Sequence, residues 1–91
     1  MYFVYVLFSP SFRVYYKGYT ENITNRLAQH NGGLSRYTAG KGPWELIILE
    51  SYPTKREALI REKSLKRCKS EYFEWLRHQP QNLCYKAMPY L

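Results

Sequence analysis

The apolar residues of the chain fall into three short runs that polar stretches separate. Residues 3–8 are almost all β-branched or aromatic, which predicts a strand covered on both faces rather than a short helix. A second strand-like run covers residues 14–19, so these two runs should pair as an antiparallel hairpin. The third strand is expected at residues 44–52, whose continuous apolar centre again indicates two covered faces.

Alternation along the predicted hairpin groups particular side chains. Because successive side chains of a strand point to opposite faces, Phe3, Tyr5 and Leu7 should share one face. Tyr16 and Gly18 should share one face of the partner strand by the same rule. A tyrosine and a glycine are therefore expected side by side where the second strand ends.

The first predicted helix follows that strand. Thr20 or Asn22 can cap it, because a short side-chain oxygen can accept an unpaired amide of the opening turn. Ile23 and Leu27 are four residues apart and form its apolar line. The helix should end in the stretch Asn31-Gly32-Gly33, where glycine favours the left-handed conformation.

Two more helices are predicted near the C-terminus. Thr54 and Glu57 fit a capping box, so a helix should start there and run to about residue 69. Its apolar side is expected to carry Ala58, Leu59 and Leu65. Ser70 is the expected N-cap of a third helix over residues 71–78, which should cover the sheet. Residues 80–91 are predicted to be an irregular tail after a core of about residues 2–79.

Length and charge narrow the class of protein. Ninety-one residues make one domain, residues 1–91, with enough apolar content to bury a modest core. Fourteen Lys and Arg against seven Asp and Glu give a net charge of +7, which favours a polyanionic partner such as nucleic acid. No basic amphipathic helix with a bulky apolar face is evident, so membrane binding is not expected.

Cysteine usage and the N-terminus indicate the compartment. Cys68 and Cys84 lack the spacing of a zinc site and are interpreted as free thiols in a reducing environment. The N-terminal residues have neither a basic lead nor a small-residue cleavage site, so they do not form a signal peptide. No apolar run is long enough to span a membrane. We expect a soluble, cytoplasmic protein.

Candidate chemistry begins at Tyr16 and continues into the first helix. The strand stops near Gly18, and the helix that follows carries Arg26 and His30 one turn apart. The planar fork of an arginine matches a phosphate, although an isolated helix arginine is more often a surface charge. A tyrosine, a glycine and two cationic or titratable groups are thus predicted close together.

Basic residues outside this stretch are candidates for binding nucleic acid. The loop over residues 34–43 is polar and glycine-bearing and carries Arg36 and Lys41. Such a loop suits a phosphate backbone and equally suits an ordinary solvated connection. Lys17, on the second strand, is a third candidate contact.

Glu62 is the most informative acidic residue. On a helix it lies three or four positions from Ala58, Leu59 and Leu65, and therefore along the apolar side. Carboxylates rarely occupy such a position without a partner. The partner could be Lys66, four residues on, in an ion pair, or a single Mg²⁺ or Mn²⁺ ion, which prefers oxygen ligands and keeps several waters.

These residues together resemble the GIY-YIG endonuclease domain, in particular its small stand-alone bacterial members. The first motif triplet appears as Val4-Tyr5-Val6 and the second as Tyr16-Lys17-Gly18. The helix arginine, the following histidine and the metal-binding glutamate of the family match Arg26, His30 and Glu62. The likeness extends over nearly the whole chain, from Tyr2 to Leu76.

The resemblance implies an α+β fold, with a small three-stranded antiparallel sheet flanked by helices, and hydrolysis of a phosphodiester with one divalent ion. In that scheme Glu62 would hold the ion, and Arg26 would neutralise charge on the phosphate. Tyr16, or else Tyr5, would take a proton from the attacking water, and His30 would orient or relay. Gly18 would let the backbone approach the reacting group. DNA is the expected substrate, with RNA as a second choice.

The sequence also departs from the family pattern. Two valines flank Tyr5 where the family has glycine and isoleucine, and Lys17 replaces the isoleucine of the second triplet. Many members carry a later asparagine that shapes the site, and Asn82 falls in the expected tail, so that role is not transferred to it. The alternative to an endonuclease is a nucleic-acid-binding module that keeps the fold without cutting, and the least favoured reading is a protein-interaction domain. The oligomeric state stays open.

Overall fold

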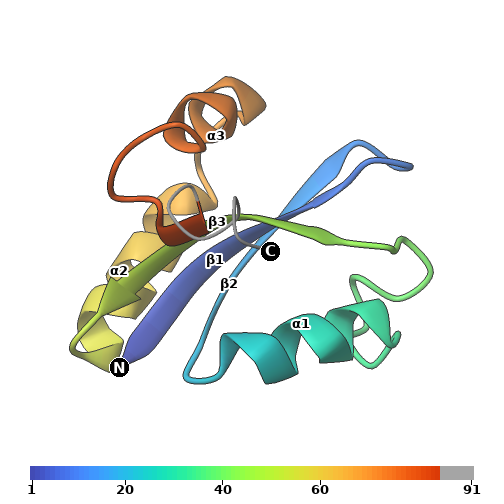
Figure 1. Ribbon diagram of the computed structural model, residues 1–91, viewed down its shortest axis with the longest axis horizontal. Coiled ribbons are helices and arrows are strands. Elements are labelled where there is room, and N and C mark those ends of the chain that lie inside the picture. The colour runs from blue at the N-terminus through green and yellow to red at the C-terminus, as the bar shows by residue number, and fades with distance from the viewer. Residues whose placement is uncertain (85–91) are drawn as a thin grey trace.

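A single sheet with three helices forms the fold of the chain (Figure 1). The computed structural model describes residues 1–84. Its elements, in order, are β1 (Tyr2–Ser9), β2 (Val14–Thr20), α1 (Ile23–Asn31), β3 (Glu45–Tyr52), α2 (Lys55–Leu65) and α3 (Ser70–Leu76). The strands are antiparallel in the order β2-β1-β3, so β1 is central and the other two are edges. The predicted α+β class is confirmed.

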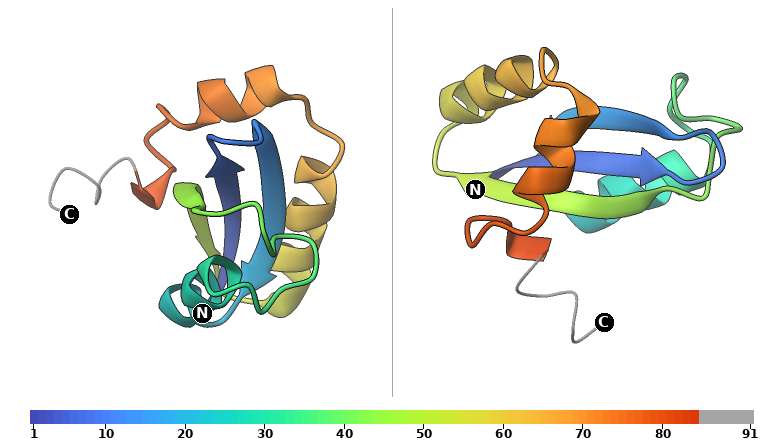
Figure 2. Two further views of the ribbon diagram at one scale, coloured as in Figure 1. Left: turned by 90° about the vertical axis from the view of Figure 1, so that its right-hand side faces the viewer. Right: turned by 90° about the horizontal axis from the view of Figure 1, so that it is seen from above.

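The hairpin register brings the two motif triplets side by side, and Tyr5 and Leu7 share a face as the alternation predicted. Tyr5 lies opposite Gly18, and Leu7 lies opposite Tyr16. Tyr5 and Leu7 are buried with Trp44 in a cluster against which Ile23 and Leu27 of α1 also pack. α1 therefore covers this face of the sheet (Figure 2).

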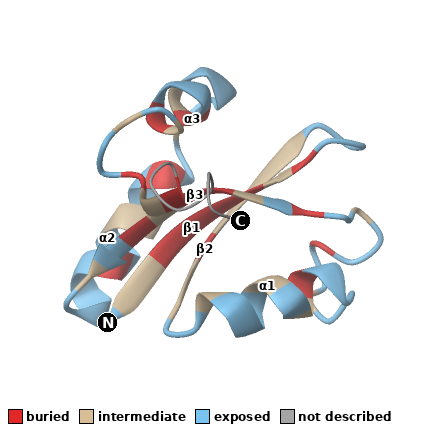
Figure 3. Cartoon of the chain, in the orientation of Figure 1, coloured by how far each residue is buried: buried red, intermediate tan, exposed pale blue. Residues whose placement is uncertain are grey.

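The opposite face of the sheet packs against α2 and α3. Val4, Val6 and Ile48 are buried there with residues of both helices: Ala58, Leu65, Phe73 and Leu76. α2 lies beside β2, and α3 crosses the sheet on the side away from α1 (Figure 2). Residues 4–7 of β1 are all buried, which confirms a strand covered on both faces, and the centre of β1 is the most continuous buried stretch in Figure 3.

Two of the predicted helix starts are confirmed and one is wrong. The side chain of Asn22, rather than Thr20, accepts the amide of Asn25 at 3.0 Å. Thr54 accepts the amide of Glu57 at 3.2 Å, as the capping box requires. The prediction that Ser70 caps the third helix is wrong, because Ser70 is the first residue of α3 and its hydroxyl donates to a carboxylate oxygen of the next residue, Glu71.

α2 is shorter than predicted. It ends at Leu65 rather than near residue 69, because the amides of Arg67 and Cys68 each bond to a carbonyl only three residues back. This tighter turn ends the α-helical pattern. Leu59, predicted on the apolar side, is 38% exposed, whereas Ala58 and Leu65 are fully buried. The apolar stripe of α2 is therefore narrower than the sequence suggested.

The stretch after α3 that is described, up to residue 84, packs against the outer edge of β3. Asn82 is 1% exposed, its Oδ1 accepts the amide of Leu49 at 2.9 Å, and its Nδ2 donates to the carbonyl of Ile47 at 2.9 Å. Its amide group thus satisfies backbone groups of an edge strand. The rest of the predicted tail lies outside the described residues. Within residues 1–84, no helix has the length and apolarity that crossing a membrane needs.

Candidate active site

A buried chain of hydrogen bonds links β1, α1 and the loop that follows α1. The hydroxyl of Tyr5 lies 3.0 Å from Nε2 of His30, and Nδ1 of His30 lies 2.7 Å from Oγ1 of Thr38. All three residues are at most 2% exposed. Two of the candidate site residues, Tyr5 and His30, are thus brought together inside the molecule.

The proton positions in this chain follow from its last member. The Thr38 hydroxyl donates to the carbonyl of Ser35 at 3.4 Å, so its oxygen accepts from Nδ1–H of His30. Nε2 of His30 then accepts from the hydroxyl of Tyr5. This assignment gives every hydroxyl hydrogen an acceptor, and it directs the phenolic proton of Tyr5 toward the imidazole.

Burial fixes the charge state of both groups. It lowers the pKa of His30, with a further contribution from the positive charge of Arg26, so the imidazole is neutral near pH 7. Burial also raises the pKa of Tyr5 well above its usual range; Tyr16 and, more weakly, Glu62 raise it further, and Arg26 opposes the shift. Both shifts therefore keep the pair neutral, with the proton on the Tyr5 oxygen.

Gly18 makes room for the ring of Tyr5. A Cβ atom on Gly18 would lie 2.5 Å from the Tyr5 hydroxyl oxygen and 2.7 Å from its Cζ. The ring therefore lies directly over the backbone of β2, and its hydroxyl reaches that strand from β1. Glycine is required here by a side chain of the neighbouring strand.

Tyr16 belongs to a row of rings that runs outward from His30. Its ring centroid lies 4.8 Å from that of His30 and 5.6 Å from that of Tyr37, which is 51% exposed. The Lys41 ammonium lies 4.9 Å from the Tyr37 centroid. No hydrogen bond within residues 1–84 engages the Tyr16 hydroxyl, so it is available to a substrate or a water.

Arg26 and His30 lie one turn apart on α1 but differ in burial. Arg26 is exposed and donates to the side chain of Gln29 at 3.3 Å, while His30 is buried. Arg26 nonetheless acts on the pKa values of both Tyr5 and His30. The guanidinium of Arg26 is therefore exposed to solvent beside the site and takes no part in the buried hydrogen bonds of Tyr5, His30 and Thr38.

Glu62 extends from α2, on the other side of β2. It lies between the buried Ala58 and Leu65, and its side chain is only 15% exposed, which confirms the predicted position along the apolar side. Its carboxylate pairs with Lys66 at 3.3 Å, the ion pair that the spacing suggested. The Lys66 side chain is 56% exposed, so this pair is open to solvent and weak. Glu62 is also close enough to act on the pKa of Tyr5.

The fit of a metal can be judged from the donors present. Within the described part of the chain, no cluster of three or more His, Cys, Asp or Glu side chains could hold an ion. A lone carboxylate such as Glu62 suits Mg²⁺ or Mn²⁺, which retain several waters, and it does not suit zinc, which takes three or four protein ligands.

The three predicted nucleic-acid contacts lie in different places. Lys17 is half-buried on the face of the sheet away from Tyr16, where it donates to the carbonyl of Tyr15 at 3.3 Å and lies 5.6 Å from the ring centroid of Phe73. Burial, and then the nearby Lys66, lower its pKa. Arg36 is exposed on the loop after α1, and Lys41 donates to the carbonyl of Tyr37. Of the three, Lys41 lies nearest to Tyr16 by contact, over the Tyr37 ring that packs against the Tyr16 ring.

Comparison with known proteins agrees with this geometry. The family model of the GIY-YIG catalytic domain matches residues 1–74. The chain belongs to the GIY-YIG catalytic domain family. In this GIY-YIG domain the two motif triplets lie on adjacent antiparallel strands, with Tyr5 directly over Gly18.

Its relatives are small UPF0213 proteins. The chain is 42% identical to one from Natronomonas pharaonis over 76% of its own length and 85% of the relative, and 41% identical to UPF0213 protein YazA of Bacillus subtilis over 80% and 79%. A solution NMR structure of a UPF0213 protein from Bacillus halodurans has 30% identity and a TM-score of 0.55, covering 89% of this chain and 87% of that one. The fold is thus shared with a solved relative.

Thr38 and Tyr37 are the site residues that sequence reasoning missed. The loop that carries them was considered only for its basic residues, and neither spacing nor periodicity relates it to β1. Trp44, whose Nε1 donates to the carbonyl of Thr38 at 3.0 Å, anchors the loop over the site. In the sequence, the large apolar side chain of Trp44 directly after this polar loop could have indicated that the loop packs back against the sheet.

Proposed function

We propose that this GIY-YIG domain is an endonuclease that hydrolyses a phosphodiester bond of DNA with one bound divalent ion. The observation that carries the proposal is geometric. The Tyr16 ring lies 4.8 Å from the ring of His30, whose imidazole is bonded to Tyr5. Arg26 is exposed one turn before His30 on α1, and Glu62 on α2 is near enough to affect the pKa of Tyr5.

Each residue has a role that its surroundings support. Arg26 is exposed and can fork onto phosphate oxygens, neutralising charge that builds in the transition state. Glu62 would hold Mg²⁺ or Mn²⁺, and the ion when bound would polarise the phosphate and stabilise the leaving oxygen. For that, the carboxylate must exchange the ammonium of Lys66 for the ion, which the exposure of Lys66 permits.

Tyr16 is the preferred acceptor of the proton from the attacking water. Its hydroxyl has no partner within residues 1–84, and its ring lies against His30. A phenol is a poor base near pH 7, because its ordinary pKa is about 10, so the proton must be able to move on. Tyr5, the alternative acceptor, is 1% exposed and donates to Nε2 of His30, so it orients that imidazole beside the Tyr16 ring.

Glu62→Gln tests the proposal. Purified protein is incubated with Mg²⁺ or Mn²⁺ and single-stranded, flapped and branched DNA, and product strands are resolved on a gel. Glutamine keeps the size of the side chain and removes its charge, so we expect cleavage to fall at least about 100-fold. Glu57→Gln, an exposed change of the same kind on the same helix, should cleave like the wild type. Equal cleavage by Glu62→Gln and the wild type would refute the mechanism.

One observation favours the binding-only alternative. The ammonium of Lys66 already pairs with the Glu62 carboxylate, so a metal ion would have to compete with it for that carboxylate. A module without catalysis predicts salt-dependent binding of the same oligonucleotides and no product at any metal concentration. The gel assay separates the two functions directly.

A further inference from the structure

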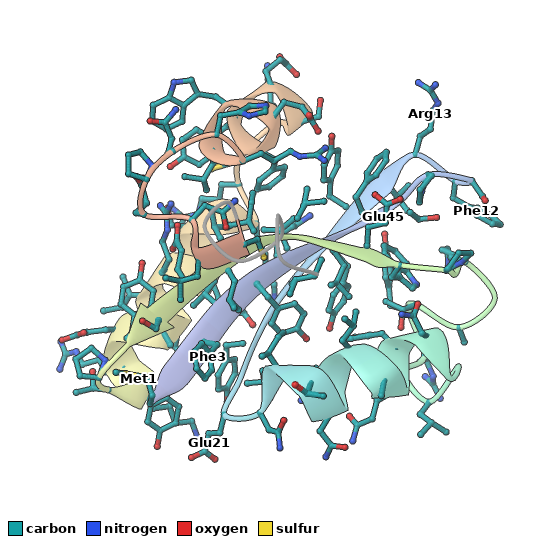
Figure 4. All side chains as sticks on the ribbon, viewed as in Figure 1. Met1, Phe3, Phe12, Arg13, Glu21 and Glu45 are labelled. Carbon is teal, nitrogen blue, oxygen red and sulfur yellow. The ribbon has the colours of Figure 1, made fainter. Side chains whose placement is uncertain are left out.

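A polar pocket lies at the end of the sheet where the chain leaves β2 and begins α1. It is a pocket of about 350 Å³, within the size range of ligand sites. Its lining comes from the start of β1, the end of β2 and the first turns of α1 and α2: Tyr2, Tyr19, Thr20, Glu21, Asn22, Arg26 and Lys55. In Figure 4, Glu21 lies at the same end of the sheet as Met1 and Phe3.

We infer that this pocket binds the phosphate and base of a nucleotide a few positions along the strand from the scissile phosphate. The inference rests on the proposed function, because that function requires a DNA strand to pass the candidate site. Arg26 lines the pocket and lies one turn of α1 before His30, which is bonded to Tyr5, so the pocket lies beside the candidate site. One DNA strand can therefore occupy both.

Lys55 is placed to bind the phosphate of that nucleotide. No ion pair or hydrogen bond within the described residues engages its ammonium, which is exposed at the start of α2. Lys55 and Glu62 are seven residues apart and so lie on the same side of α2, separated by about 10 Å along the helix axis. At about 3.4 Å of rise per nucleotide in a duplex, that distance corresponds to about three nucleotides.

Two tyrosine rings supply the surface for the base. Tyr2 and Tyr19 are half-buried, packed by one side against the core cluster of the α2 face and open to the pocket by the other. Within residues 1–84 neither hydroxyl has a hydrogen-bond partner. Rings held in this way can stack on a base without sequence preference.

One acidic group opposes the anion. Glu21 is exposed at the rim, so the pocket has two positive charges against one negative charge. The inference therefore makes predictions of opposite sign: removing the charge of Lys55 should weaken binding, and removing that of Glu21 should strengthen it.

Binding of a fluorescein-labelled thymidine dodecamer, followed by anisotropy in EDTA at several salt concentrations, tests the inference without cleavage. Lys55→Ala should lower the affinity and reduce the slope of log K against log salt by about 0.7, the value for one phosphate of a single strand. Glu21→Gln should raise the affinity. Lys63→Ala, an exposed lysine of α2 outside the pocket, is the matched control and should keep the wild-type slope.

Tyr19→Leu separates stacking from charge. Leucine keeps apolar packing against the core but removes the ring, so affinity should fall about fivefold or more with an unchanged salt slope. If Lys55→Ala, Tyr19→Leu and Lys63→Ala bind alike, the pocket is not a nucleotide site, and the nuclease proposal stands or falls separately on Glu62→Gln. If the pocket variants behave as expected and no metal supports cleavage, the pocket inference holds and the nuclease proposal fails.

Discussion

Gly18→Ala is the sharpest test of how this site is built. The added Cβ would lie 2.5 Å, 2.7 Å and 3.2 Å from three atoms of the Tyr5 ring system: Oη, Cζ and Cε1. Ordinary contacts between carbon atoms are about 3.5–4.0 Å, so the ring must move by about 1 Å. Tyr5 is 1% exposed and bonded to His30, so the ring has little room to yield.

The expected cost follows from two effects. Forcing an extra methyl into a packed site costs about 1–3 kcal/mol. Displacing the Tyr5 hydroxyl beyond hydrogen-bond range of Nε2 costs about 1 kcal/mol more. The free energy of unfolding should therefore fall by about 2–4 kcal/mol, and the melting temperature by about 8 °C or more for a chain of this size.

Urea unfolding followed by circular dichroism measures this change. Gly42→Ala is the control, because a Cβ there would meet its nearest atoms at ordinary distances of 3.6 Å and more. It should stay within about 1 kcal/mol of the wild type. A Gly18→Ala protein as stable as Gly42→Ala would refute the account of Gly18 as space for Tyr5.

A double-mutant cycle locates the effect. Tyr5→Phe removes the oxygen that makes the closest contact at 2.5 Å and leaves the ring carbon at 2.7 Å. Gly18→Ala should therefore cost less in the Tyr5→Phe background than in the wild type, with a coupling energy of at least about 0.5 kcal/mol. If the changes in unfolding free energy of Gly18→Ala and Tyr5→Phe simply add, the strain of Gly18→Ala does not come from contact with the Tyr5 hydroxyl.

Two further predictions concern stability. Burial lowers the pKa of His30 in the folded state, so below about pH 6.5 the unfolded chain binds more protons than the folded chain. The free energy of unfolding should therefore fall as the pH drops from 7 toward 5.5, by at most about 1.4 kcal/mol per pH unit. Urea titrations should show this loss in His78→Gln and not in His30→Gln. Asn82→Ala should cost about 3 kcal/mol, because backbone groups at the edge of β3 lose their partners, while Gln81→Ala should stay within about 0.5 kcal/mol; thermal unfolding compares the two.

The local elements were determined by the sequence. The apolar runs predicted three strands within one residue at each end, and alternation predicted that Tyr5 shares a face with Leu7, and Tyr16 with Gly18. This works because strand periodicity and helix capping depend on neighbouring residues only. The position of Glu62 along the apolar side of α2 followed in the same way. The pairing of Tyr5 with Gly18 came only from the register of the folded hairpin.

Tertiary structure decided what each site residue contacts. His30 and Arg26 are one turn apart on one helix, yet only His30 is buried, because Thr38 and Tyr5 receive its two ring nitrogens. Thr38 comes from a loop without periodicity, so no local pattern could relate it to β1. The structural role of Asn82 could not be predicted from the sequence either, because its partners are backbone groups of an edge strand more than thirty residues earlier. Such contacts depend on how the chain closes its loops, and local preference carries no information about that.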